Sequence, residues 1–113
     1  MPHFVIEYFT EDPDCFDKQA VMRAALEVGA ASGVMVREDL KVRLLPSEAI
    51  LFGDGRRSFI HVTLSLLEGR SMEAKLALST ALVGALRETC PNIAAISADI
   101  RDMAGDCYKK SLV

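Results

Sequence analysis

The stretch FIHVTLSLL, residues 59–67, carries the strongest strand signal in the chain. It is rich in β-branched and apolar residues, which favour an extended conformation. Its alternate side chains are apolar on one side, namely Ile60, Val62, Leu64 and Leu66. The other side is mixed, with Phe59, His61, Thr63, Ser65 and Leu67. Because both sides carry apolar residues, we expect both faces of the resulting sheet to be buried.

The residues after this strand predict a helix and a further strand. Ser71 is expected to cap the helix, which has Glu73 in its first turn and runs to about Cys90, before Pro91. Its apolar residues at helical spacing are Met72, Leu76, Val83 and Leu86. Residues 93–100 then predict a strand, which gives the second half of the chain a β-α-β order.

The first half shows the same order. Residues 2–8 predict a strand, and residues 40–45 predict another that has Lys41 and Arg43 on one face. Between them, Asp14 is a plausible helix cap with Asp17 in the first turn, and the helical run ends at Ser32-Gly33. The apolar residues of that run are Phe16, Ala20, Val21, Ala24, Ala25 and Val28.

The two halves form a repeat. Asp14 and Ser71 lie 57 positions apart, which is about half of the 113 residues. We therefore expect a single domain, residues 1–113, built of two units of about 1–57 and 58–113. Right-handed crossovers make the strands of each unit parallel, and a pseudo-twofold between the units puts both helices on one face. The expected fold class is α+β, a duplicated β-α-β unit in a four-stranded mixed sheet.

The opposite face of this sheet has no covering helix. Because the strand at residues 59–67 puts apolar side chains on that face, we expect another subunit to bury it in an obligate oligomer. The alternative is a monomer in which the loop at residues 46–58 and the C-terminal tail fold over the face. That loop contains Gly53-Asp54-Gly55 but lacks the spacing of a phosphate-binding loop, so we interpret it as a connection.

The charge balance and the cysteines indicate which partners and which compartment to expect. The formal charge is −3, with no excess of Lys and Arg, so we expect neither a nucleic-acid partner nor an anionic membrane. The chain start lacks a basic signal-peptide region, and no stretch approaches the ~20 apolar residues of a membrane span. The cysteines Cys15, Cys90 and Cys107 cannot all pair within one chain, which favours reduced thiols and a cytoplasmic location.

Pro2 is the first candidate for chemistry. A proline directly after the initiator Met is a good substrate for methionine removal, which would leave a secondary amine at the chain terminus. An unperturbed α-amino group has a pKa of about 7.7 to 8.0, and burial or nearby cations lower that pKa. A base with a pKa of about 7 suits proton transfer at neutral pH. The alternative interpretation is a strand that simply begins with Met-Pro.

A set of cations is the second candidate. Lys41 and Arg43 share a strand face, and Arg70 stands at the junction between a strand and a helix, where Gly69 gives the backbone freedom. Guanidinium groups and helix N-termini both favour anions, so together these residues could bind a dicarboxylate or tricarboxylate. Taken singly, each could instead be an ordinary solvated charge.

The remaining polar residues give weaker signals. His3 and His61 stand in no metal-ligand spacing with each other or with cysteine, so we expect no metal. We interpret His61 as a hydrogen-bonded interior or interface histidine. No nucleophile motif such as GxSxG occurs, and Cys15, near a helix N-terminus, has no assigned base.

Three segments of the chain resemble one protein family. They are the start Pro2-His3-Phe4-Val5-Ile6-Glu7-Tyr8, the run from Phe59 through Gly69-Arg70-Ser71-Met72-Glu73, and the ending Tyr108-Lys109-Lys110. These segments resemble the 5-carboxymethyl-2-hydroxymuconate Δ-isomerase family of the tautomerase superfamily, which also contains 4-oxalocrotonate tautomerase and macrophage migration inhibitory factor. The resemblance covers nearly the whole chain.

The resemblance implies a tautomerase-like homotrimer without a cofactor. In the family, the amino-terminal proline is a general base that moves a proton between the 2-hydroxyl oxygen of a dienol and a carbon of the conjugated chain, and arginines hold the carboxylates. Arg70 matches a family arginine directly, Arg43 lies in the strand that supplies another, and Lys41 stands where a further arginine is expected. A lysine keeps the charge but loses bidentate geometry, which bears on the substrate more than on the superfamily.

The expected function is therefore an isomerase acting on an unsaturated 2-hydroxy/2-oxo polycarboxylate in aromatic catabolism. Pro2 is the expected base after removal of Met1, and Arg43, Arg70 and Lys41 are expected to bind the substrate. The expected partners are copies of the same chain and a small carboxylate. One alternative is a non-catalytic trimer of the same fold that binds a small carboxylate or another protein. The other is a tautomerase of a smaller keto acid, such as an aryl pyruvate.

Overall fold

The computed structural model describes residues 1–113, with the exception of the side chain of Cys15. Two short turns of 3-10 helix, η1 (Pro13–Cys15) and η2 (Arg37–Asp39), accompany two helices, α1 (Lys18–Ala31) and α2 (Met72–Thr89). The strands are β1 (His3–Phe9), β2 (Lys41–Pro46), β3 (Phe59–Leu67) and β4 (Ala95–Met103). The strand predicted at residues 59–67 is confirmed to the residue, whereas the last strand lies two to three residues later than predicted.

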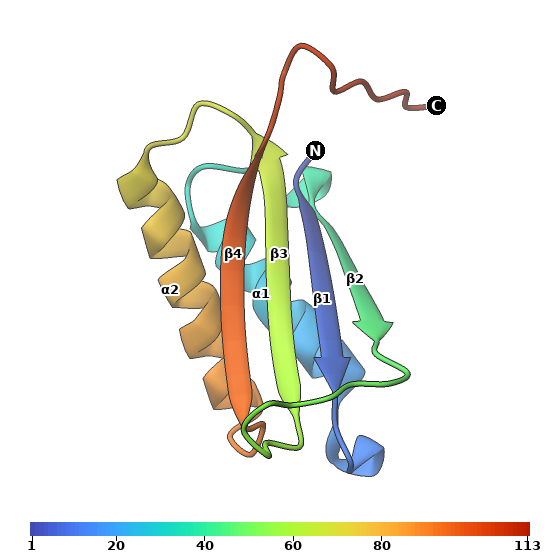
Figure 1. Ribbon diagram of the computed structural model, residues 1–113. Coiled ribbons are helices and arrows are strands. Elements are labelled where there is room, and N and C mark those ends of the chain that lie inside the picture. The colour runs from blue at the N-terminus through green and yellow to red at the C-terminus, as the bar shows by residue number, and fades with distance from the viewer.

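The four strands form one mixed sheet in the order β2-β1-β3-β4. β1 is parallel to β2 and β3 is parallel to β4, whereas the two central strands, β1 and β3, are antiparallel. Figure 1 shows both helices behind the sheet, on the same face. The predicted α+β architecture of two β-α-β units with both helices on one face is therefore confirmed.

A pseudo-twofold relates the two units. Ile6 pairs with Val62 at the centre of the antiparallel pair. β1 and β3 begin 56 positions apart, at His3 and Phe59. In each unit, the first residue of the leading strand pairs with the first residue of the trailing strand, which is Lys41 in one unit and Ala95 in the other. Equivalent ends of the two units therefore lie at opposite ends of the sheet.

The core lies between the sheet and the two helices. The central strands contribute fully buried side chains, namely Phe4, Ile6, Ile60, Val62, Leu64 and Leu66. The helices contribute Val21 and Ala25 from α1, and Leu78, Leu82 and Leu86 from α2. α1 packs tightly on the sheet at Gly29, where an added Cβ atom would stand 2.8 Å from Phe4 Cζ. The absence of a side chain at Gly29 is therefore what allows this close packing.

The cap of α1 differs from the prediction. Asp17, not Asp14, occupies the N-cap position, and its side chain accepts a hydrogen bond from Ala20 N at 3.0 Å. Asp14 lies instead in η1, which begins at Pro13. Proline suits the first position of a helical turn because it has no amide hydrogen to satisfy there, so the chain makes this short turn before the helix begins. The two caps, Asp17 and Ser71, are therefore 54 positions apart rather than 57.

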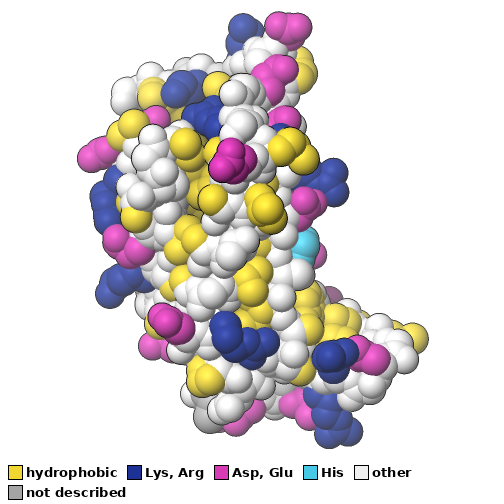
Figure 2. All heavy atoms as spheres, turned by 90° about the vertical axis from the view of Figure 1, so that its left-hand side faces the viewer, with side chains coloured by type: hydrophobic (Ala, Val, Ile, Leu, Met, Phe, Trp, Pro, Cys, Tyr) yellow, Lys and Arg dark blue, Asp and Glu magenta, His cyan; other side chains and the backbone are white. Residues whose placement is uncertain are grey.

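Two of the apolar residues noted at helical spacing, Met72 and Leu76, do not lie on the buried side of α2. Their exposed fractions are 77% and 67%, whereas Leu78, Leu82 and Leu86 are buried. These three leucines are spaced four residues apart, so they form a single stripe along the helix, and that stripe meets the sheet. Met72 and Leu76 lie beside the edge strand β4. Figure 2 faces this side of the molecule and shows hydrophobic side chains in a band between charged ones.

The face of the sheet opposite the helices, which we call the open face, carries His3, Lys41, Arg43, His61 and Thr63 among others. Figure 1 is drawn from this side and shows the connection from β2 to β3 crossing only the lower end of the sheet. The monomeric alternative, in which this loop and the tail cover the face, is therefore not what the structure shows. The chain exposes 7102 Å², about 1,000 Å² more than the ~6,100 Å² expected of a compact monomer of this mass.

Candidate active site

Pro2 is buried at the start of β1, on the side of the sheet that faces the helices. Its carbonyl oxygen accepts a hydrogen bond from Lys41 N at 3.3 Å, which ties it to the start of β2. It lines a hollow of about 220 Å³, which we call the Pro2 hollow. The other walls are Met1, residues 34–36 with Asp39, the end of β3, and two cations, Arg70 and Lys110.

Arg70 is brought to this hollow by the turn between β3 and α2. Gly69 has a φ of +122°, which residues with a side chain rarely adopt, and it directs the chain out of the strand. The Arg70 guanidinium donates from Nη1 to Leu67 O at 2.9 Å and from Nη2 to Val34 O at 2.8 Å. A guanidinium carries about five N–H donors, so about three stay free for an anion while the backbone holds the group in place.

Lys41 and Arg43 lie on the open face instead. In the register of β1 and β2, Lys41 pairs with His3, and Arg43 follows on the same side of the sheet. Both cations are exposed. The structure therefore brings Pro2 and Arg70 together on one side of the sheet and places Lys41 and Arg43 on the other.

His3 links the open face to the C-terminal tail. Its Nδ1 lies 3.3 Å from Arg43 Nη1, and its Nε2 lies 3.3 Å from Tyr108 Oη. Because a guanidinium can only donate, Nδ1 must accept, and the ring hydrogen is therefore on Nε2, which donates to Tyr108. Partial burial lowers the pKa of His3, and Arg43, the chain N-terminus and Lys41 lower it further. All of these effects favour the neutral ring that this geometry requires.

Two charged residues of the Pro2 hollow, Lys110 and Asp39, were not predicted. Lys110 belongs to the ending that carries the family resemblance, but neither periodicity nor spacing indicates where a tail beyond the last strand will lie. In the part of the chain that the structure describes, neither of these residues nor Arg70 forms an ion pair. The two cations outnumber the one carboxylate, so the hollow favours an anion.

The other candidates lie away from this hollow. His61 Nδ1 is 2.6 Å from Ser97 Oγ on the open face. Burial raises the pKa of the Cys90 thiol, which disfavours the reactive thiolate. The expectation for Cys15 concerns a side chain outside the described residues. Among the side chains that the structure describes, no group of three or more His, Cys, Asp or Glu is placed to hold a metal ion.

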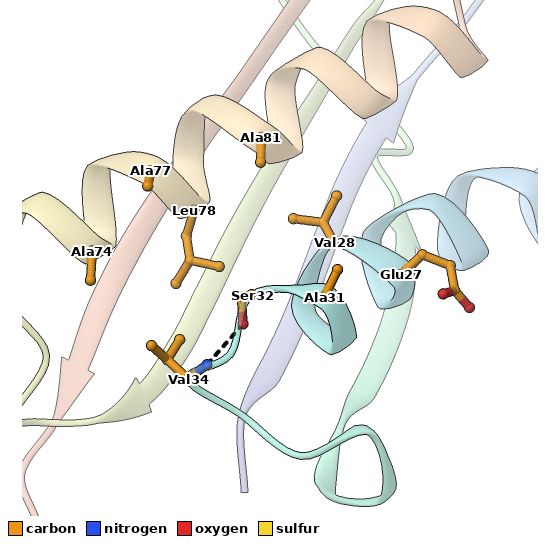
Figure 3. A pocket seen from close by; sticks show the side chains of 9 residues that line it. All are labelled: Glu27, Val28, Ala31, Ser32, Val34, Ala74, Ala77, Leu78 and Ala81. Carbon is orange, nitrogen blue, oxygen red and sulfur yellow. Dashed lines mark hydrogen bonds between the residues drawn. The ribbon is translucent and has the colours of Figure 1, made fainter.

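A hollow of about 510 Å³ lies between the two helices. Figure 3 shows its apolar walls, Ala74, Ala77, Leu78 and Ala81 of α2 and Val28 and Ala31 of α1. Glu27 is the one charged residue among those that line it, and this carboxylate is paired with Arg37 at 2.6 Å. This hollow therefore offers neither a free carboxylate base nor a cation for an acidic substrate.

Neither helix of the described chain has the length and hydropathy to cross a bilayer.

No protein-family model matches the sequence, and a comparison with curated proteins gives no match. Solved structures do match. A 5-carboxymethyl-2-hydroxymuconate delta-isomerase has a TM-score of 0.80 and 18% identity, with 100% of this chain and 89% of the other covered. A 5-carboxymethyl-2-hydroxymuconate isomerase from Deinococcus radiodurans R1 has a TM-score of 0.81 and 21% identity, with 97% and 88% covered. A fused 4-OT symmetric trimer has a TM-score of 0.74 and 19% identity, with 90% and 85% covered.

The chain therefore has the fold of 5-carboxymethyl-2-hydroxymuconate isomerases and related tautomerases. The resemblance that the sequence segments indicate is confirmed at the level of the fold. A fold hosts many chemistries, so the activity has to be argued from the Pro2 hollow itself.

Proposed function

We propose that the protein is a cofactor-independent isomerase that moves a proton along an unsaturated 2-hydroxy/2-oxo polycarboxylate in the breakdown of aromatic compounds. The observation that carries this proposal is that Pro2, buried at the start of β1, and Arg70, half-buried before α2, line one hollow. The isomerases among the solved structures of the same fold support the class of reaction.

Pro2 is the proposed base. Once Met1 is removed, the Pro2 nitrogen is a secondary amine, and the space that Met1 takes up in the hollow is open to substrate. Burial of Pro2 and the Arg70 guanidinium in the same hollow disfavour the charged form of this amine. The neutral amine takes a proton from the 2-hydroxyl oxygen and returns it to a carbon of the conjugated chain. The double bonds shift, and the substrate neither gains nor loses atoms.

Arg70 is the proposed anchor for a substrate carboxylate. The N–H groups that do not bind Leu67 O or Val34 O are free to hold a carboxylate or to stabilise the negative charge that develops on an enolate oxygen. Because the two carbonyl groups hold the guanidinium before the substrate arrives, little reorganisation accompanies binding.

Lys41 and Arg43 are the proposed outer cations, which attract the substrate without lining the Pro2 hollow. Both are exposed on the open face, at the end of the sheet where β1 begins. Exposed cations of this kind raise the local concentration of an anionic substrate. Arg43 also contacts His3, and so steadies the residue that follows Pro2.

We further propose that the protein is a homotrimer whose subunits associate through their open faces and leave the end of the sheet with Lys41 and Arg43 accessible. A solved structure of this fold is a symmetric trimer. The excess exposed area of about 1,000 Å² is also of the size that one partner buries in a standard interface, about 800 Å². Light scattering at micromolar concentration tests this proposal, and a stable monomer would contradict it.

The proposed location is the cytoplasm. Cys90 and Cys107 are free thiols, and Cys107 is exposed. A reducing compartment keeps such thiols free.

Ketonisation of 2-hydroxymuconate by the protein lacking Met1 tests the enzymatic proposal. Intact mass establishes that Met1 is absent, and absorbance follows the loss of the dienol. We expect turnover above the buffer-catalysed rate, and a lower rate for Pro2→Ala. The proposal would be contradicted if the rate does not exceed the background, or if the parent protein and Pro2→Ala have equal rates.

One other function, turnover of a smaller keto acid, has an observation in its favour, and carboxylate binding without catalysis is the remaining alternative. The volume of the hollow, about 220 Å³, is below the ~300 Å³ at which small-molecule pockets usually begin, which favours a smaller keto acid. Faster turnover of phenylpyruvate, which has one carboxylate, than of 2-hydroxymuconate, which has two, would favour the keto acid. Carboxylate binding without turnover would favour the non-catalytic function.

A further inference from the structure

The C-terminal tail runs from the end of β4 to the start of β1. Gly105 N donates to Glu68 Oε2 at 2.5 Å, and Glu68 N donates to Met103 O at 3.0 Å. These two bonds fix the beginning of the tail against the connection between β3 and α2. Figure 1 shows the tail leaving the upper end of β4 and passing above the N-terminus.

Tyr108 is the next point at which the tail is held. Its hydroxyl oxygen lies 3.3 Å from His3 Nε2, and the two rings meet edge to face with centroids 6.3 Å apart. His3 in turn faces Arg43 through Nδ1, so the ring is held on both sides. The contact joins the tail to the residue that directly follows Pro2.

Lys110 then lines the Pro2 hollow, two residues after this contact. It is exposed, and in the described chain no carboxylate lies within ion-pair distance of its ammonium group. Arg70 reaches the same hollow from the connection between β3 and α2. The hollow thus has two cations on separate elements, one held by backbone carbonyls and one carried by the tail.

We propose that residues 108–110 form a strap in which Lys110 binds a second carboxylate of the substrate and Tyr108 positions the strap through His3. This inference rests on the proposed isomerase function and deepens it. Arg70 holds one carboxylate and Lys110 holds the other, so the strap selects dicarboxylates over monocarboxylates. Lys110 is a specificity-determining residue, and Tyr108 is a positioning residue.

Steady-state kinetics of Lys110→Ala on two substrates test the strap. The dicarboxylate is 2-hydroxymuconate, and the monocarboxylate is 2-hydroxy-2,4-pentadienoate. Hydrogen bonds to charged groups contribute about 1.5–3 kcal/mol, so we expect KM for the dicarboxylate to rise about 10- to 100-fold. KM for the monocarboxylate and both kcat values should stay within about twofold. Lys110→Arg should restore most of the loss, because it keeps the cation.

Lys109→Ala is the matched control, because Lys109 is exposed and does not line the hollow. It removes the same charge from the same tail and should leave both KM values unchanged. Tyr108→Phe keeps the ring but removes the hydroxyl, so we expect a several-fold rise in KM for the dicarboxylate alone. Equal losses in Lys109→Ala and Lys110→Ala, or equal losses on both substrates, would overturn the proposal.

Binding of non-reacting analogues separates failure of the strap from failure of the isomerase proposal. Calorimetry with cis,cis-muconate, a dicarboxylate, and sorbate, a monocarboxylate, requires no turnover. We expect Lys110→Ala to weaken muconate binding at least about tenfold and to leave sorbate unchanged, whether or not the protein isomerises anything. If Lys110→Ala binds both analogues as tightly as the parent protein, the strap is refuted even for an active enzyme.

Discussion

The two ends of the sheet carry hollows of nearly equal size, about 220 Å³ at Pro2 and about 230 Å³ at the opposite end. Each forms where a strand-to-helix connection of one unit meets the helix-to-strand connection of the other, as the pseudo-twofold requires. Their charges differ. Arg70 and Lys110 line the first, whereas Asp12 and Asp17 line the second. The duplicated fold therefore supplies two hollows, of which only one suits an anionic substrate.

Arg70 has a structural counterpart at the opposite end. Arg87 of α2 donates from Nη1 to Pro91 O at 3.2 Å and to Ile93 O at 2.5 Å. Both arginines thus hold a connection by bonding to its backbone carbonyls, but only Arg70 also lines a hollow. The contact between an arginine and backbone carbonyl groups is therefore a structural feature of both ends of the sheet. Only at the end with Pro2 do the chain start and the tail add groups that can bind a substrate.

Retention of Met1 should have the largest effect. An added residue that blocks methionine removal leaves the Pro2 nitrogen as an amide, and we expect kcat to fall about 10²- to 10⁴-fold because the base is lost. Ser58 is the matched position, since it precedes β3 as Pro2 precedes β1, and its Oγ accepts from Ala94 N at 2.8 Å. Ser58→Ala should leave kcat unchanged. Equal kcat values with and without Met1 would show that the two ends do not differ in this way.

Arg70→Ala and Arg87→Ala should separate binding from structure. Each change leaves two carbonyl groups without their partner, so we expect each to lower the free energy of unfolding by about 1–2 kcal/mol. Only Arg70→Ala should also lower kcat/KM, by about 10- to 100-fold, because it removes a charged hydrogen bond to the substrate. Urea unfolding and steady-state kinetics measure the two effects. A comparable loss of kcat/KM in Arg87→Ala would argue for an indirect effect of stability.

The glycines of the two helices should respond with opposite signs. Gly29 in α1 would place a Cβ atom 2.8 Å from Phe4 Cζ, whereas Gly84 in α2 has no neighbouring atom within 4 Å of that position. We therefore expect Gly29→Ala to lower the free energy of unfolding by about 1–3 kcal/mol through overpacking. Gly84→Ala should raise it by about 0.5–1 kcal/mol, because alanine is the better helix former. Denaturant titrations at one protein concentration measure both changes in the free energy of unfolding. If both substitutions change it in the same direction, the prediction is wrong.

The smallest expected effect is on the titration of His3. Its pKa is lowered by partial burial and then by Arg43, so the folded chain binds fewer protons than the unfolded chain at this residue. The neutral His3 ring therefore makes its full contribution to the free energy of unfolding above its unfolded pKa of about 6.5. This contribution is lost as the pH falls through the lower pKa of the folded state. Arg43→Gln should raise the pKa of His3, as followed by NMR. An unchanged pKa would show that Arg43 does not act on this ring.

Much of the fold could be predicted from the chain itself. The strand at residues 59–67 has a strict alternation with a fully apolar side, and the structure matches it to the residue. The errors arise where local signals compete. Asp14 and Asp17 are both good caps, and Pro13 decides between them by forming a separate turn. α2 has apolar residues on more than one side, so spacing alone could not tell the stripe of Leu82 from that of Leu76.

The candidate site was less accessible to sequence reasoning. Pro2 and Arg70 could be singled out by their chemistry, and the antiparallel pairing of β1 with β3 is what brings them to one end. Alternation correctly placed Lys41 and Arg43 on one face, but it could not say that Pro2 lies on the other. Lys110 was missed because its position depends on contacts of the tail with residues more than 100 positions earlier.

Segments near both ends of the chain line the Pro2 hollow, namely Met1 and Lys110 of the tail. An affinity tag at either terminus is therefore not a neutral addition to this protein, because it occupies or crowds the place where substrate is proposed to bind. Joining the ends by circular permutation would keep the core and remove the terminal amine. New termini opened within the β2–β3 connection, at the opposite end of the sheet, would then give a folded reference protein with no base.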